Sequence, residues 1–168
     1  MSDFDQLIIE QIPRLRRYAR ALSGDRSRAD DLVQDTLERA WTRFHLWQRG
    51  SNLRAWLFSV MHNVFANQHQ RNKNQRTESL DDTAPELSVV DSADSSLQQR
   101  DLHKALEQLS PEYREVLLLV GLEQMSYEET AEILKIPLGT VMSRLARGRE
   151  RLRVLMSGEA PVTLRRIK

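Results

Sequence analysis

The chain has 168 residues, of which 40% are hydrophobic and 29% are charged, and aromatic residues are few. This composition is typical of a helical globular protein and excludes a disordered chain or a membrane protein. Because cysteine is absent, disulfide bonds and thiolate metal sites are excluded, and no apolar run is long enough to span a bilayer. The first residues lack the layout of a secretory signal, so we expect a cytoplasmic protein without direct membrane insertion.

The net charge of +1 is unevenly distributed along the chain. Residues 1–72 hold eleven basic and eight acidic residues, residues 73–97 hold two and six, and residues 98–168 hold twelve and ten. The three segments therefore carry +3, −4 and +2. Because this length also admits two small domains of about 70 residues each, the charge pattern favours two domains joined by an acidic linker.

Apolar residues recur at helical spacing three times within residues 1–72. Each stripe predicts an amphipathic helix, and Ser51 or Asn52 is placed to cap the third. Three such helices can bury one shared core, so residues 1–72 are predicted to form the first domain. The stripes are Ile8, Ile12, Leu15, Ala19 and Leu22, then Ala29, Val33, Thr36, Leu37, Ala40 and Phe44, and then Leu53, Trp56, Leu57, Val60, Met61 and Val64.

The second of these helices carries an acidic arc opposite its apolar stripe, made of Asp31, Gln34, Asp35 and Glu38. A carboxylate cluster can bind magnesium, a basic protein surface or only water. Magnesium prefers additional ligands, which nothing else in the segment supplies. A basic partner and a solvated face both remain open.

Polar residues also follow the third helix and the loop that precedes it. Asn63, Asn67 and Gln70 form a polar row close to Arg71, and amides suit base edges. The loop of residues 46–52 contains Trp47, Ser51 and Asn52 with a glycine, a composition able to pocket an unstacked base. A loop tryptophan that packs on its own domain is the simpler alternative. The four histidines lack metal-site spacing, so we expect no metal and no cofactor.

Helical spacing is lost in residues 73–97, which we predict to be a flexible acidic linker. It returns in residues 98–168, the predicted second domain, which ends in a short basic tail. There Ser110 precedes Pro111 as a helix start, and Ser126 with Glu129 forms a capping box at the next one. The whole chain is thus predicted to be all-α.

The segment from residue 126 to residue 155 has the pattern of a helix-turn-helix. A short helix leads to a turn at residues 135–138, and the next helix buries a seam of Val141, Leu145, Gly148, Leu152 and Leu155. Its other side carries a reading row, Thr140, Ser143, Arg144 and Arg147, that can lie in a major groove. Arginine matches the acceptor pair of guanine, and Arg149, Arg151 and Arg153 can anchor phosphates. A solvated basic helix is the alternative.

Three strings, DDLVQDTLERAW, SNLRAWLFSVMHNVFANQHQR and MSYEETAEILKIPLGTVMSRLARGRERL, occur in this order across the acidic linker. Together they resemble the two-domain extracytoplasmic-function (ECF) sigma factors of bacterial RNA polymerase. The resemblance extends from about Ile12 to Leu155 and implies promoter-specific transcription initiation with help in strand opening. The partners that it implies are RNA polymerase core, promoter DNA and an anti-sigma protein.

The resemblance also implies roles for particular positions. Asp31, Gln34 and Asp35 would bind the clamp helices of the polymerase largest subunit. His62 and Asn63, with the loop of residues 46–52, would hold a flipped-out base of the minus-ten element, and Trp47 would lie beside it. The minus-thirty-five element would be read as duplex by the reading row. Many relatives carry a basic residue where Met142 stands, so this chain departs from them there.

Two other functions remain as alternatives. A polymerase-independent repressor could use the same helix-turn-helix, but it would need a dimer surface to place two recognition helices one DNA turn apart. A metal-dependent hydrolase could use Asp30, Asp31 and Asp35, but the sequence offers it no nucleophile or base. No obvious dimer seam is present in the sequence, and we expect no enzymatic activity.

Overall fold

The computed structural model describes residues 3–78 and 97–158, and every regular element in these residues is helical. The predicted all-α class with two small helical domains is therefore confirmed. Of the expected linker, residues 79–96 lie outside the described residues, as does the expected basic tail from residue 159. The elements are α1 (Asp3–Ser23), α2 (Arg26–Thr42), η1 (Phe44–Leu46), α3 (Leu53–Glu78), α4 (Leu97–Gln108), α5 (Pro111–Leu117), η2 (Leu118–Leu122), α6 (Tyr127–Leu134) and α7 (Leu138–Ser157).

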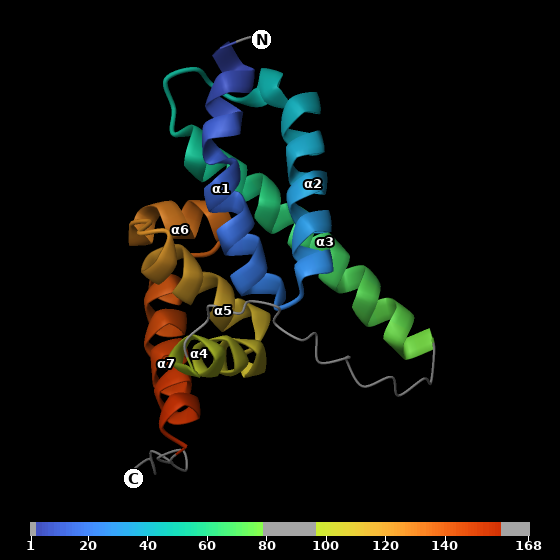
Figure 1. Ribbon diagram of the computed structural model, residues 1–168. Helices are drawn as coiled ribbons and strands as arrows, with labels where there is room; N and C mark the ends of the chain where they lie inside the picture. Colours follow the sequence, from blue (N-terminus) through green and yellow to red (C-terminus); the bar gives the residue numbers. More distant parts are fainter. Residues whose placement is uncertain (1–2, 79–96, 159–168) are drawn as a thin grey trace.

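The first domain consists of α1 to α3, with α1 and α2 antiparallel and α3 crossing them (Figure 1). The turn between α1 and α2 needs Gly24, which adopts a positive φ of 71°. Asp25 then caps α2 by accepting a hydrogen bond from the Ser27 amide at 3.0 Å. Tyr18 meets Phe58 edge-on, with ring centroids 5.0 Å apart, in the core between α1 and α3.

The predicted stripes of this domain face its core, with local differences. Phe44, expected at the end of the second stripe, lies in η1 and is 50% exposed. Asn52 rather than Ser51 caps α3, since its Oδ1 accepts from the Ala55 amide at 3.2 Å. The helix α3 continues to Glu78, so residues 73–78 are helical although they were expected to belong to the linker.

The second domain contains α4 to α7. Ser110 precedes α5 in extended conformation but makes no capping bond with its side chain, so only Pro111 fulfils the predicted helix start. The reciprocal Ser126–Glu129 capping box is present, with both bonds at 3.0 Å. Between α6 and α7 the chain turns through Lys135 at φ 57°. Gly148 lets α7 approach α5 closely, because a Cβ there would lie 3.3 Å from Leu117.

The capping box gives a prediction for stability. Replacing Ser126 with alanine removes an acceptor for the Glu129 amide and should lower the free energy of unfolding by about 1 kcal/mol. Ser126→Thr keeps the acceptor and should restore most of this loss. Urea denaturation of the full chain measures both variants, and equal stability of Ser126→Ala and the parent would contradict the expected contribution.

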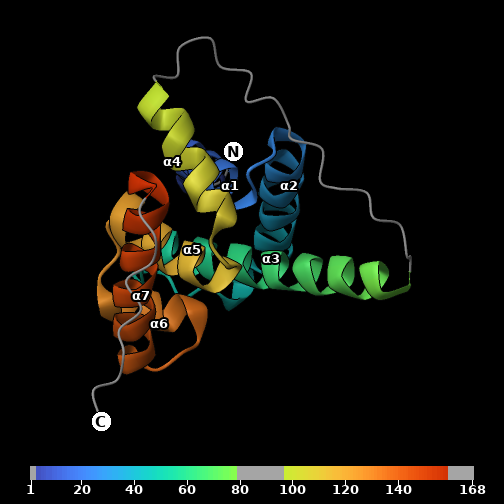
Figure 2. The ribbon, with the colours of Figure 1, turned by 90° about the horizontal axis from the view of Figure 1, so that it is seen from below.

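The two domains pack against each other instead of standing apart (Figure 2). The helix α1 contacts α4, α5 and η2, and α3 contacts α6. Buried residues of both domains form one continuous apolar cluster, to which the first domain contributes Phe58 and the second contributes Leu119. This packing determines which functional side chains reach solvent.

Candidate nucleic-acid interface

The reading row lies on α7, the second helix of the helix-turn-helix. Val141 and Leu145 are buried beneath it, and Ser143 and Arg147 are exposed. Arg144 is 29% exposed, and its Nη2 lies 4.0 Å from an oxygen of Glu112 on α5. Thr140 is half-buried. The row thus presents two exposed side chains, Ser143 and Arg147, although the Ser143 hydroxyl donates to the Thr140 carbonyl at 3.2 Å. The guanidinium of Arg144 is held loosely by an exposed carboxylate.

The lower part of α7 differs from the predicted seam. Gly148 is buried, Leu152 is half-buried and Leu155 is 37% exposed, so the seam loosens along the helix. Arg149 is exposed. The expected phosphate anchors beyond it already have partners in the fold. The Arg151 guanidinium stacks over the Tyr113 ring at 5.1 Å, and Arg153 donates to Glu150 at 2.8 Å.

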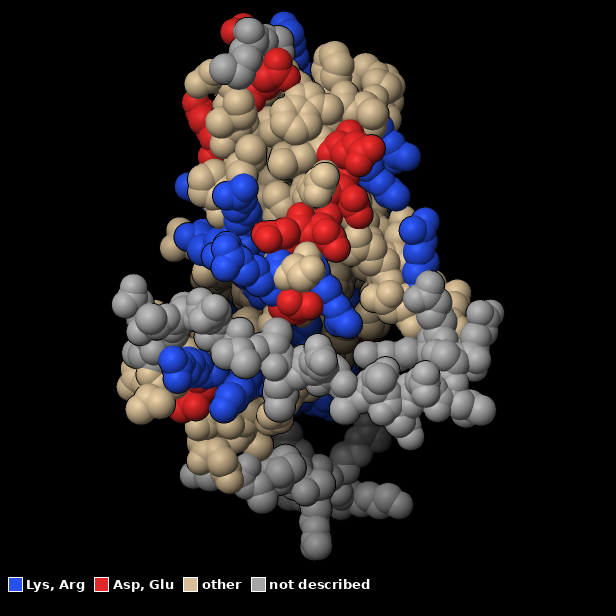
Figure 3. All heavy atoms as spheres, turned by 45° about the vertical axis from the view of Figure 1, so that its right-hand side comes forward, with Lys and Arg blue, Asp and Glu red and all other residues tan. Residues whose placement is uncertain are grey.

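The acidic arc lies on the outer side of α2. Asp31, Gln34 and Glu38 are exposed. Asp35 is half-buried because its Oδ2 accepts from the Gln68 amide of α3 at 2.8 Å. Figure 3 shows a band of acidic side chains, flanked by basic ones, on the face that includes α2. This face can meet a basic protein surface through three side chains, while Asp35 also connects two helices.

The loop before α3 directs its tryptophan into the first domain. Trp47 is half-buried in an aromatic cluster with Phe4, whose ring centroid lies 5.8 Å away, and Phe4 in turn contacts Phe44 at 5.0 Å. Ser51 is exposed, and its hydroxyl donates to the Gln48 carbonyl. Packing on its own domain was the simpler alternative for this tryptophan. In this conformation the Trp47 ring packs on Phe4, so it is not positioned to stack on an unpaired base.

The polar row on α3 is only partly free. Asn67, Gln70 and Arg71 are exposed and Asn63 is half-buried. The start of α3, in contrast, meets the second domain. Asn52 Nδ2 donates to Glu129 Oε2 at 2.8 Å, and His62 Nδ1 lies 2.7 Å from Glu115 Oε1.

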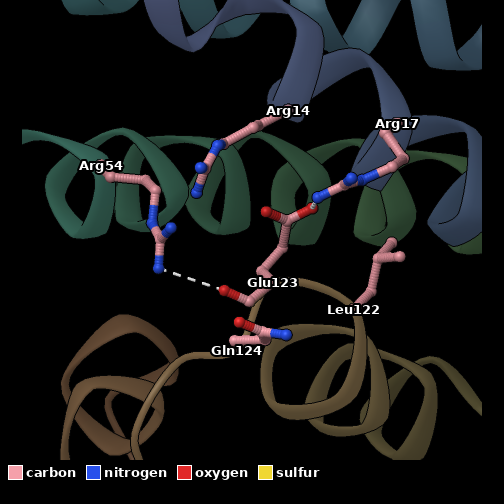
Figure 4. Close-up of a pocket in the computed structure, with 6 residues that line it drawn as sticks. All are labelled: Arg14, Arg17, Arg54, Leu122, Glu123 and Gln124. Carbon is pink, nitrogen blue, oxygen red and sulfur yellow. Dashed lines mark hydrogen bonds and ion pairs between the residues drawn. The ribbon is translucent and has the colours of Figure 1, made fainter.

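Three arginines converge on the buried Glu123 between the domains, a group that the sequence analysis missed. Arg17 donates to Glu123 Oε1 at 3.1 Å, and Arg54 donates to the Glu123 carbonyl at 3.1 Å. Arg14 is the third of these arginines. Together with Gln124, the three arginines line a cavity of about 370 Å³ (Figure 4). The π-helical turn η2 places Glu123 there through a bond from its amide to the Leu118 carbonyl.

Burial at this interface also affects two neighbouring groups. Desolvation raises the pKa of Tyr18 well above its usual value, and the nearby charges of Glu115 and Glu123 raise it further. Desolvation lowers the pKa of Arg114, although Glu107 and Glu115 oppose this effect. Arg114 crosses the interface by donating to the Leu22 carbonyl at 2.6 Å. Charged groups are thus desolvated where the two domains meet.

Within the ranges 3–78 and 97–158, no group of three or more His, Asp or Glu side chains is arranged to hold a metal ion. In the same ranges no helix is both long and apolar enough to cross a membrane.

Comparison with known proteins assigns both domains to families. The model of the Sigma2 domain of PhyR matches residues 8–62, and the model of Sigma-70, region 4 matches residues 99–152. The ECF RNA polymerase sigma factor EcfG of Rhodopseudomonas palustris is 37% identical over 149 residues, which are 89% of this chain and 82% of that protein. The ECF RNA polymerase sigma factor SigE of Mycolicibacterium smegmatis is 35% identical over 162 residues, which are 91% of this chain and 61% of that protein.

A solved structure has the same arrangement of helices. It is the complex of the sigma factor RpoE with the anti-sigma factor NepR from Bartonella quintana. Its TM-score is 0.85 at 36% identity, and the match covers 95% of this chain and 100% of that chain.

Proposed function

The chain belongs to the ECF RNA polymerase sigma factors, which direct promoter-specific transcription initiation, and we propose that three separate surfaces carry out this function. The first domain, residues 1–72, binds polymerase core and reads the minus-ten element. The second domain, which begins with α4, reads the minus-thirty-five element, and the residues between Glu78 and Leu97 link the two. The observation that carries the proposal is a sigma-2 domain followed in one chain by a region-4 domain with an exposed reading row.

The proposed minus-thirty-five reader is α7. The guanidinium of Arg147 is exposed, and a bidentate pair with guanine is worth about 1 to 3 kcal/mol of discrimination. Ser143 can bond to a base or a phosphate, and Arg149 to the backbone. Thr140 and Arg144 complete this surface, with Arg144 able to leave Glu112 because the two atoms are 4.0 Å apart.

The proposed minus-ten reader comprises the loop of residues 46–52 and the polar side of α3. Its members are Trp47, Ser51, Asn52, His62, Asn63, Asn67, Gln70 and Arg71. The exposed amides on α3 support contacts with an unstacked strand. Trp47, packed on Phe4, contributes by holding the loop unless it rotates out when DNA binds.

The acidic arc is the proposed contact for polymerase core. Exposed carboxylates at Asp31 and Glu38, with Gln34 between them, suit a basic helical partner. The Asp35 carboxylate also accepts a hydrogen bond from Gln68 and so connects α2 to α3. We assign the chain no covalent chemistry of its own, and its place of action is the cytoplasm, where core transcribes.

An anti-sigma protein is a further proposed partner. The solved relative RpoE forms a complex with the anti-sigma factor NepR, and this chain covers the whole length of that relative at 36% identity. An anti-sigma factor of that kind would therefore suit this chain, and co-purification from cells can reveal it.

Transcription from genomic fragments with purified core tests the proposal. Transcripts with defined start points should appear only when the chain is added, and their upstream regions should share two spaced sequence elements. A polymerase-independent repressor would give a different result. It would bind DNA tightly as a dimer in the absence of core, and no new transcripts would appear.

A further inference from the structure

A buried carboxylate oxygen lies without a partner in the cavity between α1, α3 and η2. Oε1 of Glu123 accepts from Arg17 at 3.1 Å, but Oε2 is buried and no group of the described residues donates to it. The side chain of Glu123 has no exposed surface. A buried carboxylate oxygen without a hydrogen bond is unfavourable, because it has lost its water and gained no donor. The position of Oε2 therefore suits a ligand that supplies a donor.

The same cavity is rich in cations. Arg14 and Arg17 line it from α1, and Arg54 lines it from α3. Figure 4 shows these three side chains around that of Glu123. Three guanidinium groups and one carboxylate give a net charge of +2, and the other lining residues carry no charge. This balance favours an anionic ligand.

The arginines have donors left for such a ligand, because a guanidinium carries five N–H groups. Among the described residues, Arg17 donates through Nη2 to Glu123. Arg54 also uses Nη2, to donate to the Glu123 carbonyl and to Met125 Sδ. Arg14 is exposed and has no ion pair in the described part of the chain. Paired guanidinium N–H groups match the oxygens of a tetrahedral oxyanion, so the cavity has the donors that bind phosphate or sulfate.

The unpartnered carboxylate oxygen distinguishes between these anions. Sulfate carries no proton near neutral pH, so its oxygens would face Oε2 of Glu123 with no donor between them. Hydrogen phosphate keeps one O–H group, which can donate to Oε2 while its other oxygens accept from the guanidinium groups. A phosphomonoester loses its last proton with a pKa of about 6 and has no such donor at higher pH. Charge and donor pattern together select inorganic hydrogen phosphate.

The cavity has room for this ligand and a way in. Its volume of about 370 Å³ is within the range of small-molecule sites. Arg14 and Gln124 are exposed, and the side chain of Arg17 is 53% exposed. A ligand therefore reaches Oε2 of Glu123 by displacing long side chains at the surface, and the apolar core stays in place.

We propose that this cavity is a phosphate site, in which the three guanidinium groups bind hydrogen phosphate and Glu123 accepts a hydrogen bond from its O–H group. None of the lining residues belongs to the acidic arc, the reading row or the proposed minus-ten reader. The ligand contacts the first domain through α1 and α3, and the second domain at the end of η2. The site is thus separate from the surfaces proposed to read promoters and to bind core.

Isothermal titration calorimetry of the full chain tests this selection, in phosphate-free buffer at about pH 8 and at constant ionic strength. Inorganic phosphate, sulfate and methyl phosphate are the three probes. Because a hydrogen bond to a charged group distinguishes them, phosphate should bind at least about tenfold more tightly than the other two. Comparable affinities for phosphate and either other anion would overturn the proposal, and so would the absence of saturable phosphate binding. These titrations contain neither core nor DNA, so their failure is distinct from failure of the proposed function.

A change at the surface of the cavity tests the donors. Arg14→Gln removes an exposed guanidinium and should weaken phosphate binding at least about fivefold, whereas the fold should persist. Arg16→Gln makes the same change in charge at an exposed site of α1 outside the cavity and should leave binding unchanged. An equal effect of the two variants would attribute binding to general attraction and contradict the site.

Glu123→Gln tests the acceptor. Its amide oxygen can still accept from Arg17, whereas its NH₂ group then faces the ligand as a donor. The preference for phosphate over sulfate should therefore fall to about threefold or less, and sulfate binding should rise. Thermal unfolding without phosphate establishes whether the variant is folded, and if it is not, the anion selection of the parent and the effect of Arg14→Gln decide. A folded Glu123→Gln chain that kept the full preference for phosphate would overturn the assigned role of Glu123.

Discussion

Reversal of two carboxylates of the acidic arc, Asp31→Lys with Glu38→Lys, should lower the affinity for polymerase core by about a hundredfold, or about 2.7 kcal/mol. Both side chains are exposed on α2. Like charges facing a basic partner repel, whereas the fold should not change. Asp35 is left intact because it accepts from Gln68, and its reversal would also disturb the contact between α2 and α3.

The matched control for this prediction is Glu10→Lys with Glu132→Lys, which alters the net charge equally at exposed sites outside the arc. Core binding by fluorescence anisotropy at fixed salt should separate the two variants. DNA binding by α7 should be the same in both. Parent-like core affinity in the arc variant would mean that the carboxylates are only solvated.

Loss of both guanidinium groups from the reading row, Arg144→Ala with Arg147→Ala, should reduce use of the minus-thirty-five element by about 2 to 4 kcal/mol in total. Arg147 should carry more of this loss, since Arg144 is partly engaged by Glu112. Core affinity should survive, because α7 lies in the other domain from the acidic arc. Footprinting of the holoenzyme, together with core titration, measures both effects.

Arg16→Ala with Arg26→Ala removes the same charge from exposed positions of the first domain and should leave upstream protection intact. A variant of the reading row that kept upstream protection but lost core affinity would show that α7 has been assigned the wrong partner.

Local patterns of the sequence were sufficient to predict most of the helices. The stripe containing Leu15 and Leu22 is buried as expected, because a 3.6-residue period determines which face of a helix can meet a core. The capping box at Ser126 was equally predictable, since both of its bonds join residues three positions apart.

Contacts between the domains could not be predicted in the same way. His62 and Glu115 are 53 positions apart, and no periodic pattern links them. Glu123 lies after a π-helical turn, and no sequence pattern indicated that this acidic residue would be buried. Trp47 could be assigned to a base pocket or to its own domain from composition alone, and only the position of Phe4 distinguishes the two in this conformation.

We propose that this chain reads promoters as part of a polymerase holoenzyme. The most direct measurement is a titration of labelled promoter duplex with the full chain, with and without core, at one stated salt concentration. With net charges of only +3 and +2 on its two DNA-reading segments, and with part of its minus-ten face covered by the second domain, the free chain should bind poorly. Tight, specific binding should appear when core is added. Nanomolar binding of the free chain as a dimer, unchanged by core, would contradict the account and support a repressor instead.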